Sequence, residues 1–134
     1  MLCGFNKPAP RDFVGYGPLT APESVAVYNF TLKHRFNLII SYHTQGKEIY
    51  YEFQDYTPEV SREIADKFAE VSGYRVAEVP YNSSFAGYKD WFIYHYRKPG
   101  FTIEAGIGIN PLPISQFDSI YSDNLGILVL GMMQ

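Results

Sequence analysis

The chain has 134 residues, a formal net charge of −3 and a pI near 5.5, and 46% of its residues are hydrophobic. This length and apolar content suit one globular domain and exclude an intrinsically disordered chain. The acidic balance and the absence of any long run of basic residues argue against nucleic-acid binding. The only cysteine, Cys3, excludes both an intrachain disulfide and a cysteine-based zinc site. No apolar run approaches the roughly 20 residues that a membrane span needs.

The chain opens with a predicted loop and continues with a predicted helix. Residues 1–19 are rich in glycine and proline, which favours a loop. The pattern that begins at Thr20 and ends at Glu23 predicts a capping box, in which Thr20 caps the helix and Glu23 reaches back. Pro22 suits the first helical turn. We expect this helix to run to about His34, with one apolar face formed by Val25, Tyr28 and Leu32.

Two strands and a second helix are expected next. The apolar run 36–42 ends at His43 and has the pattern of a strand buried on both faces. A second strand is predicted over residues 47–53. The clearest helix of the chain starts at residues 57–59 and ends at Gly73, because glycine suits the residue after a helix. Its apolar positions follow helical spacing: Val60, Ile64, Phe68 and Val71.

The rest of the chain alternates between the same two kinds of element. Residues 74–79 and 100–108 read as strands, and residues 80–92 as a loop with a turn of helix. A loop at 110–113 leads into a final helix. Helices that alternate with apolar strands predict an α/β fold with a mixed, mostly parallel sheet flanked by helices. In such sheets the ligand site lies beyond the carboxyl ends of the strands, where His43 stands.

Three residues are candidates for a site. Imidazole is a common metal ligand and acid–base group, so His43 is one, although a histidine at a strand end can also be a hydrogen-bonded loop residue. Glu104 lies in an otherwise apolar strand, where a carboxylate with a raised pKa suits a general base. The alternation of this strand also allows Glu104 to face solvent. Tyr81 lies in a loop of small and polar residues that can close on a ligand, or it is a packed surface tyrosine.

Four segments in order resemble the zinc metallocarboxypeptidase family, the carboxypeptidase A-like peptidases. They are FVGYGPLTAPES, ISYHTQGKEIYY, YNSSFAGYKDWF and FTIEAGIGINPLP, and the resemblance runs from about residue 8 to the end. The last segment is similar to the form in the bacterial γ-D-glutamyl-meso-diaminopimelate peptidases, which cut cell-wall peptides. The resemblance implies a partial carboxypeptidase-like (phosphorylase/hydrolase-like) fold and metal-assisted amide hydrolysis, a form of proteolysis.

The resemblance also implies roles for the three candidates. His43 matches the third zinc ligand, Glu104 the general base that activates the zinc-bound water, and Tyr81 the tyrosine that closes over the substrate. The cofactor implied is Zn²⁺, and the substrate implied is a peptide or muropeptide. A catalytic zinc takes three protein ligands, and the family's His-x-x-Glu motif, which supplies the first two, does not occur in this chain.

The missing motif leads to an expectation about the whole chain. We expect residues 1–134 to be the carboxyl-terminal portion of a peptidase catalytic domain, with a loop at 1–19 and an α/β body at 20–134. Such a chain has an incomplete zinc site and is expected to be inactive alone. Its uncovered sheet edge and apolar face favour association with an amino-terminal half-domain or with itself. The alternative function is a non-catalytic module that binds peptide or peptidoglycan.

Overall fold

The computed structural model describes residues 7–9, 13, 15–79 and 87–134. The chain divides into two compact units, Met1–Phe36 and Asn37–Gln134, and each is described by itself. The first contains the helix α1 (Pro22–Lys33), which begins with a proline as predicted. The predicted capping box is wrong, because the N-cap is Ala21 and accepts no side-chain hydrogen bond. The hydroxyl of Thr20 instead donates to the carbonyl oxygen of Gly17, 3.3 Å away.

The expected apolar face of α1 is only partly present. Val25 and Tyr28 are half-buried, but Leu32 is exposed. The buried residue of this helix is Thr31, whose hydroxyl donates to the carbonyl oxygen of Val27 at 2.8 Å. That internal hydrogen bond satisfies the hydroxyl, so a polar side chain can occupy a buried position here.

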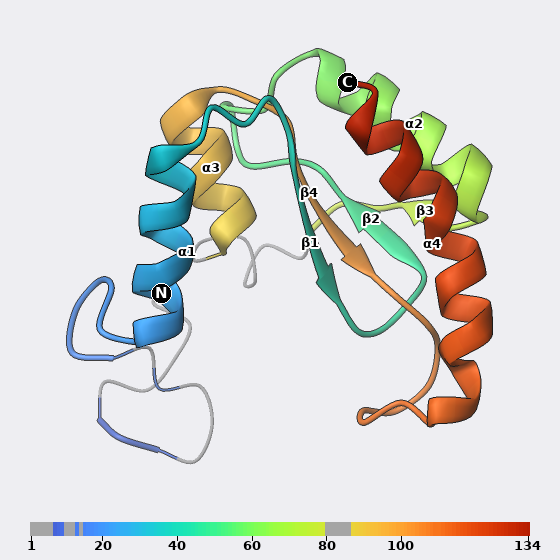
Figure 1. The fold of residues 1–134 in the computed structure, drawn as a ribbon, viewed down its shortest axis with the longest axis horizontal. Helices are drawn as coiled ribbons and strands as arrows, with labels where there is room; N and C mark the ends of the chain where they lie inside the picture. Colours follow the sequence, from blue (N-terminus) through green and yellow to red (C-terminus); the bar gives the residue numbers. More distant parts are fainter. Residues whose placement is uncertain (1–6, 10–12, 14, 80–86) are drawn as a thin grey trace. The chain divides into compact units, whose positions relative to one another are not determined.

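The second unit is built on a mixed sheet with the strand order β1-β4-β2-β3 (Figure 1). The strands are β1 (Ile39–His43), β2 (Glu48–Tyr50), β3 (Arg75–Val76) and β4 (Gly100–Glu104). The pairs β1·β4 and β2·β3 are parallel, and β2·β4 is antiparallel. The predicted α/β class with a mixed, mostly parallel sheet is therefore confirmed. Each strand is shorter than its sequence pattern indicated.

Strand β1 departs from its prediction in another way. The sequence favoured a strand buried on both faces, but β1 is one of the two edge strands of this sheet. Ile39 is buried, whereas Tyr42 and His43 are exposed. An apolar run can end at a sheet edge because only the half nearer the core packs against other elements. The carboxyl end of β1 thus leaves His43 accessible.

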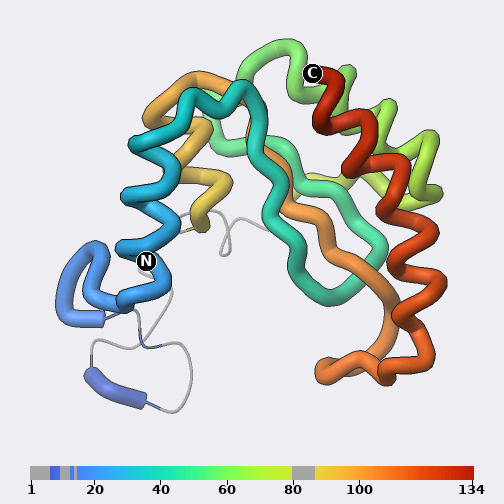
Figure 2. The backbone as a smooth tube through the Cα atoms, in the orientation of Figure 1, coloured from blue at the N-terminus to red at the C-terminus, as the bar shows by residue number. Residues whose placement is uncertain are grey.

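Helices pack on both faces of this sheet (Figures 1 and 2). Helix α2 (Val60–Ser72) packs against β2 and β3 and lies beside α4 (Phe117–Met132), which follows a short 3₁₀ turn, η2 (Ile114–Gln116). Gly73 ends α2 in the left-handed conformation, as predicted. Helix α3 (Tyr88–Tyr96) packs against β1 and β4.

Helix α3 corrects the predicted loop at 80–92. From Tyr88 onward the chain is helical, and residues 80–86 lie outside the described part. Two side chains explain why tertiary packing overrides the loop-like composition. Phe92 is 1% and Ile93 0% exposed. A glycine at position 100 lets α3 approach, because a Cβ there would lie 3.2 Å from Cγ1 of Ile93.

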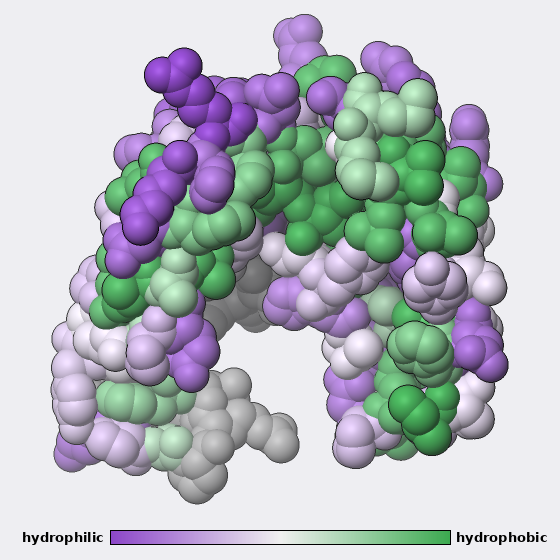
Figure 3. Space-filling view, viewed as in Figure 1, coloured by the Kyte–Doolittle hydropathy of each residue, from purple (hydrophilic) through white to green (hydrophobic). Residues whose placement is uncertain are grey.

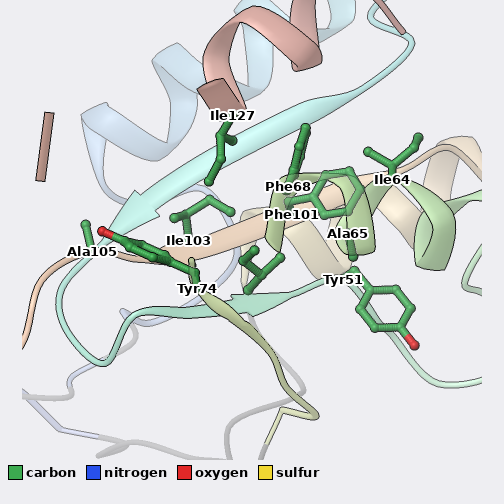
Figure 4. Close-up of a cluster of buried hydrophobic side chains, with 10 residues drawn as sticks. Tyr51, Ile64, Ala65, Phe68, Tyr74, Phe101, Ile103, Ala105 and Ile127 are labelled. Atoms are coloured by element: carbon green, nitrogen blue, oxygen red, sulfur yellow. The ribbon is translucent and has the colours of Figure 1, made fainter. Parts of the chain in front are cut away.

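The main core lies between the sheet and the pair α2 and α4 (Figure 4). Phe68 of α2 meets Phe101 of β4 edge to face, with ring centroids 5.0 Å apart. Ile103 and Ile49 point into the same cluster from β4 and β2, and both are fully buried. Each such side chain stabilises the fold by about 1.5–3 kcal/mol through burial. The core therefore fixes the position of β4.

Much of the exposed surface of α4 is apolar, although Asp118, Ser119 and Ser122 are exposed as well. Figure 3 shows hydrophobic patches over parts of the molecule. The large apolar or aromatic side chains of α4 that are about half exposed or more include Phe117, Tyr121, Leu125, Leu128 and Met132. Among the described residues, no helix is both long and apolar enough to cross a membrane.

A buried ion pair anchors the start of α3. Lys89 and Asp90 are each 5% exposed, and their side chains are hydrogen-bonded to each other. Lys89 also donates to the carbonyl oxygen of Glu52, and Asp90 accepts from the backbone N–H of Gly87 at 3.1 Å. The two charges therefore tie the amino end of α3 to the chain that follows β2. Burial of both charges is tolerated because each has a partner.

We expect Lys89→Met to lower the free energy of unfolding by about 3–5 kcal/mol, because it leaves the carboxylate of Asp90 buried without its cation. Urea denaturation followed by circular dichroism measures this change. The matched control is Lys67→Met, which removes an exposed pair with Glu63 on α2 and should cost less than about 0.5 kcal/mol. Equal losses in the two variants would contradict this account of the Lys89–Asp90 pair.

Candidate active site

Strand pairing aligns four ionisable residues across the sheet. His43 at the end of β1 is the register partner of Glu104 at the end of β4. Glu104 is also the partner of Glu48 in β2, and Glu48 is the partner of Arg75 in β3. Register partners point to the same face of a sheet, so these four side chains form one row. We call this row, His43–Glu104–Glu48–Arg75, the polar row.

The polar row lies on the face opposite the main core. Side chains alternate along β4, so Phe101 and Ile103 enter the core while Thr102 and Glu104 face the other way. Helix α3 covers this second face near Gly100, at the opposite end of β4 from Glu104. Glu104 and Glu48 are half-buried, and His43 is exposed. The carboxyl end of β4 therefore presents its polar side chains to solvent.

A short turn joins His43 to Glu48, the two residues of the row on either side of Glu104. Residues 44–47 connect β1 to β2 and pass the carboxyl end of β4, which lies between those strands. The N–H of Gly46 donates to the carbonyl oxygen of Gly106 at 2.8 Å, and the N–H of Ala105 donates to that of His43 at 2.9 Å. The side chains of Thr44 and Asn110 also bond to each other, at 2.8 Å. These bonds bind the turn to the residues that follow Glu104.

The backbone behind Glu104 is held from the core side as well. The N–H of Gly106 donates to the hydroxyl of buried Tyr74 at 3.4 Å, and the amide of Asn124 donates to the same hydroxyl at 2.9 Å. Gly106 has a φ of +76°, and a Cβ there would lie 2.5 Å from a methyl carbon of Leu112. Glycine is required at this position by both conformation and space. The chain thus leaves β4 in one defined direction.

The surroundings of Glu104 favour a proton-accepting role. Partial burial raises the pKa of the Glu104 carboxyl, and the charge of Glu48 raises it further. Nearby His43 opposes these effects and lowers that pKa, but the net shift is upward. A carboxylate with a raised pKa is a better general base near neutral pH than an ordinary one. The environment of Glu104 therefore increases the affinity of its carboxylate for a proton.

Glu48 has a different environment. The hydroxyl of Tyr50 and the guanidinium of Arg75 both donate to its carboxylate, and these hydrogen bonds hold the pKa of Glu48 below its ordinary value. Burial, together with the charges of Glu48 and Glu104, raises the pKa of Tyr50 to about 12. Tyr50 therefore stays protonated and keeps donating. Glu48 remains ionised beside Glu104.

The structure brings together two of the three residues predicted from the sequence. His43 and Glu104 are adjacent at the carboxyl ends of β1 and β4, the location expected for a ligand site. Tyr81 lies outside the described residues. Glu104 is partly exposed to solvent, which is the alternative that the alternation of its strand allowed. In the described part of the chain, no three His, Cys, Asp or Glu side chains are grouped so that they could hold a metal ion.

Sequence reasoning missed Glu48, Tyr50 and Arg75. The period-two spacing of Glu48 and Tyr50 in a predicted strand indicates that they share a face. It does not indicate that β4 pairs with this strand, or in which register. Arg75 comes from a strand of two residues, too short to give a pattern. The order of the strands in the sheet is what places these three residues in the site with Glu104.

Comparisons with known proteins agree with this fold. No protein-family model matches the chain. Solved structures with the same fold include carboxypeptidase A from Helicoverpa armigera, with a TM-score of 0.75 and 16% identity over 91% of this chain and 36% of that one. Another is bovine thrombin-activatable fibrinolysis inhibitor in complex with tick carboxypeptidase inhibitor, with a TM-score of 0.72 and 20% identity over 91% of this chain and 48% of that one. The fold is therefore a carboxypeptidase-like fold.

Two relatives define the resemblance more closely. A γ-D-glutamyl-L-diamino acid endopeptidase 1 of Lysinibacillus sphaericus is 46% identical over 127 residues, which are 95% of this chain and 32% of the relative. The uncharacterized protein YqgT of Bacillus subtilis (strain 168) is 45% identical over 123 residues, or 92% of this chain and 33% of the relative. The chain spans about one third of the length of each. The resemblance to the γ-D-glutamyl-diamino acid peptidases is confirmed at the level of sequence similarity, and the resemblance to the carboxypeptidase A-like peptidases at the level of the fold.

We expect Glu48→Gln to lower the free energy of unfolding by about 1 kcal/mol at pH 7, because it removes a charge that Arg75 and Tyr50 stabilise at a partly exposed site. The pKa of Glu48 is lower in the folded chain than its ordinary value of 4.5. Its contribution is therefore present above pH 4.5 and is lost as the pH falls through the folded pKa.

Urea denaturation of both proteins between pH 7 and pH 3 checks this expectation. The difference between wild type and Glu48→Gln should narrow as the solution becomes acidic. Glu70→Gln, at an exposed position of α2, is the matched control and should show no such trend. A difference that stays constant down to pH 3 would assign the effect of Glu48 to something other than its charge.

Proposed function

We propose that this chain supplies a metal ligand and the general base of a zinc-dependent hydrolase that cleaves amide bonds in cell-wall peptides of the γ-D-glutamyl-diamino acid type. The observation that carries the proposal is the pairing of His43 with Glu104 at the carboxyl ends of two adjacent parallel strands. The sequence similarity to a γ-D-glutamyl-L-diamino acid endopeptidase supports the substrate class. The carboxypeptidase-like fold supports the reaction class.

Glu104 performs the proton transfers in this proposal. Its carboxylate accepts a proton from the attacking water and returns that proton to the leaving amine, which is the role of a general base and then of a general acid. The raised pKa of Glu104 suits both steps. His43 offers an imidazole beside this carboxylate, from the exposed end of β1. Tyr81 is proposed to close over the bound substrate.

The residues present fit only part of a zinc site. A catalytic zinc takes three protein ligands and lowers the pKa of a bound water. His43 is suited to be one ligand, but the described residues include no group of three. The remaining ligands have to come from residues outside the described part or from a partner, for which an amino-terminal half-domain or a second copy of the chain is proposed.

We expect the isolated chain to bind zinc more weakly than micromolar, because one imidazole with a neighbouring carboxylate does not complete a site. Titration calorimetry on metal-free protein measures this, with His43→Ala as the control. We expect no hydrolysis of a γ-D-glutamyl-diamino acid peptide by the isolated chain with added zinc. Tight binding of one zinc per chain, lost in His43→Ala, would show that His43 has found further ligands.

The proposed roles can be tested in a complete enzyme. The matching 127-residue segment of the Lysinibacillus sphaericus relative is replaced by this chain, and the chimera is assayed on γ-D-glutamyl-diamino acid peptides. We expect an active chimera. Glu104→Gln should reduce kcat by at least about 100-fold, because general base catalysis contributes 10²–10⁴-fold. His43→Ala should reduce both activity and zinc content.

Glu78→Gln is the matched control for the chimera, because Glu78 is exposed and lies outside the polar row. Full activity of the Glu104→Gln chimera would overturn the role of Glu104. An alternative function, a module that binds peptide without cutting it, is favoured by the lack of a complete metal-ligand group among the described residues. A folded but inactive chimera that still binds the peptide would support this alternative.

A further inference from the structure

The hydrolysis proposed above uses only half of the polar row. Glu48 and Arg75 continue the row beyond Glu104, on the same face of the sheet. Residues directly opposite in an antiparallel pair have Cβ atoms about 4.5–5.5 Å apart. A group bound by Glu48 therefore lies close to the bond on which Glu104 acts. The separation between Glu48 and Glu104 suits recognition of the substrate side chain next to the scissile amide.

Glu48 is arranged to accept further hydrogen bonds. Its carboxylate has about four acceptor sites, and Tyr50 and Arg75 supply two donors. The Glu48 side chain is 19% exposed, so part of the carboxylate still faces solvent. Both donors fix its orientation, and its lowered pKa keeps it ionised. The result is a preorganised anionic group that needs no rearrangement to receive a cation.

Arg75 adds a complementary group at the open end of the row. Its side chain is 74% exposed, and a guanidinium has five N–H donors, of which the contact with Glu48 uses a small part. The remaining donors suit a carboxylate, which Arg binds in a bidentate manner. Glu48 and Arg75 thus present an anion and a cation side by side. Such a pair matches a ligand that carries an ammonium and a carboxylate side by side.

We propose that Glu48 and Arg75 form a specificity subsite for the charged end of a diamino acid side chain. Glu48 accepts the ammonium group, and Arg75 donates to a carboxylate beside it where the diamino acid has one. This inference rests on the proposed function, which places a diamino acid next to the amide that is cut. The charges next to the subsite agree with it, because the carboxylates of Glu48 and Glu104 outnumber the single guanidinium of Arg75.

The proposed subsite predicts a different Kd for each of three peptides that differ only in one side chain. The probes are γ-D-glutamyl-L-norleucine, which has no charge at the end of the side chain, γ-D-glutamyl-L-lysine, which has an ammonium, and γ-D-glutamyl-meso-diaminopimelate, which has an ammonium and a carboxylate. Each is titrated into the full chain, and Kd is taken from shifts of backbone amide resonances. We expect about tenfold tighter binding for each charge added, since a hydrogen bond to a charged group has about this effect.

Two variants that each remove one charge separate the two contacts. In Glu48→Gln the lysine peptide should lose its advantage over the norleucine peptide. In Arg75→Gln the diaminopimelate peptide should lose its advantage over the lysine peptide, while lysine keeps its advantage over norleucine. Glu70→Gln on α2 is the control and should change no Kd. Unchanged amide spectra in the absence of peptide show that each variant is folded.

The outcomes separate this inference from the proposed function. Equal binding of the three peptides, with an active chimera, would overturn the subsite and leave the hydrolase proposal intact. Discrimination that survives in both variants would place the charge recognition elsewhere and overturn the subsite as well. Absence of binding by all three peptides would also overturn it, because Glu48 and Arg75 lie within this chain.

Discussion

The whole arrangement depends on one strand being inserted between two others that are close in sequence. Strands β1 and β2 are joined by the short turn 44–47, yet they do not pair with each other, because β4 lies between them. β4 is parallel to β1 and antiparallel to β2. This insertion brings Glu104 between His43 and Glu48. Without it, the carboxylate would have neither neighbour.

The two faces of β4 have separate roles. On one face, Phe101 and Ile103 are fully buried and pack against α2 and α4. On the other face, Thr102 and Glu104 meet solvent and the polar side chains of neighbouring strands. Burial of the apolar side is strong enough to fix the strand, so the polar side needs few stabilising contacts of its own. A site on a rigid strand is positioned more precisely than one on a loop.

Local sequence signals predicted much of the framework. The helical spacing through Ile64 and Phe68, the glycine at 73 and the alternation around Glu104 all describe the structure correctly, because these signals act within one element. The resemblance to a peptidase family predicted the fold. Helix α3 was missed because its stability comes from burying Phe92 and Ile93 rather than from a clear pattern.

The polar row was only half predicted, for a physical reason. His43 stood out because it ends an apolar run, and Glu104 because it lies inside an otherwise apolar strand. Glu48 and Arg75 gain their significance from register, and register depends on which strands pair across long stretches of chain. The edge position of β1 has the same origin, since an apolar run alone does not tell how many neighbours a strand has. Local patterns therefore describe elements well and their pairings poorly.

The insertion of β4 also constrains how this unit folds. Neighbouring strands joined by a tight turn usually pair early as a hairpin, because closing a short loop costs little entropy. Here that route is closed, since β1 and β2 acquire their common partner only when residues 100–104 arrive from much later in the chain. The sheet consists of contacts between distant segments, which form slowly. Until β4 docks, the edges of β1 and β2 that pair with it stay open to water, and Glu104 joins the polar row only in that step.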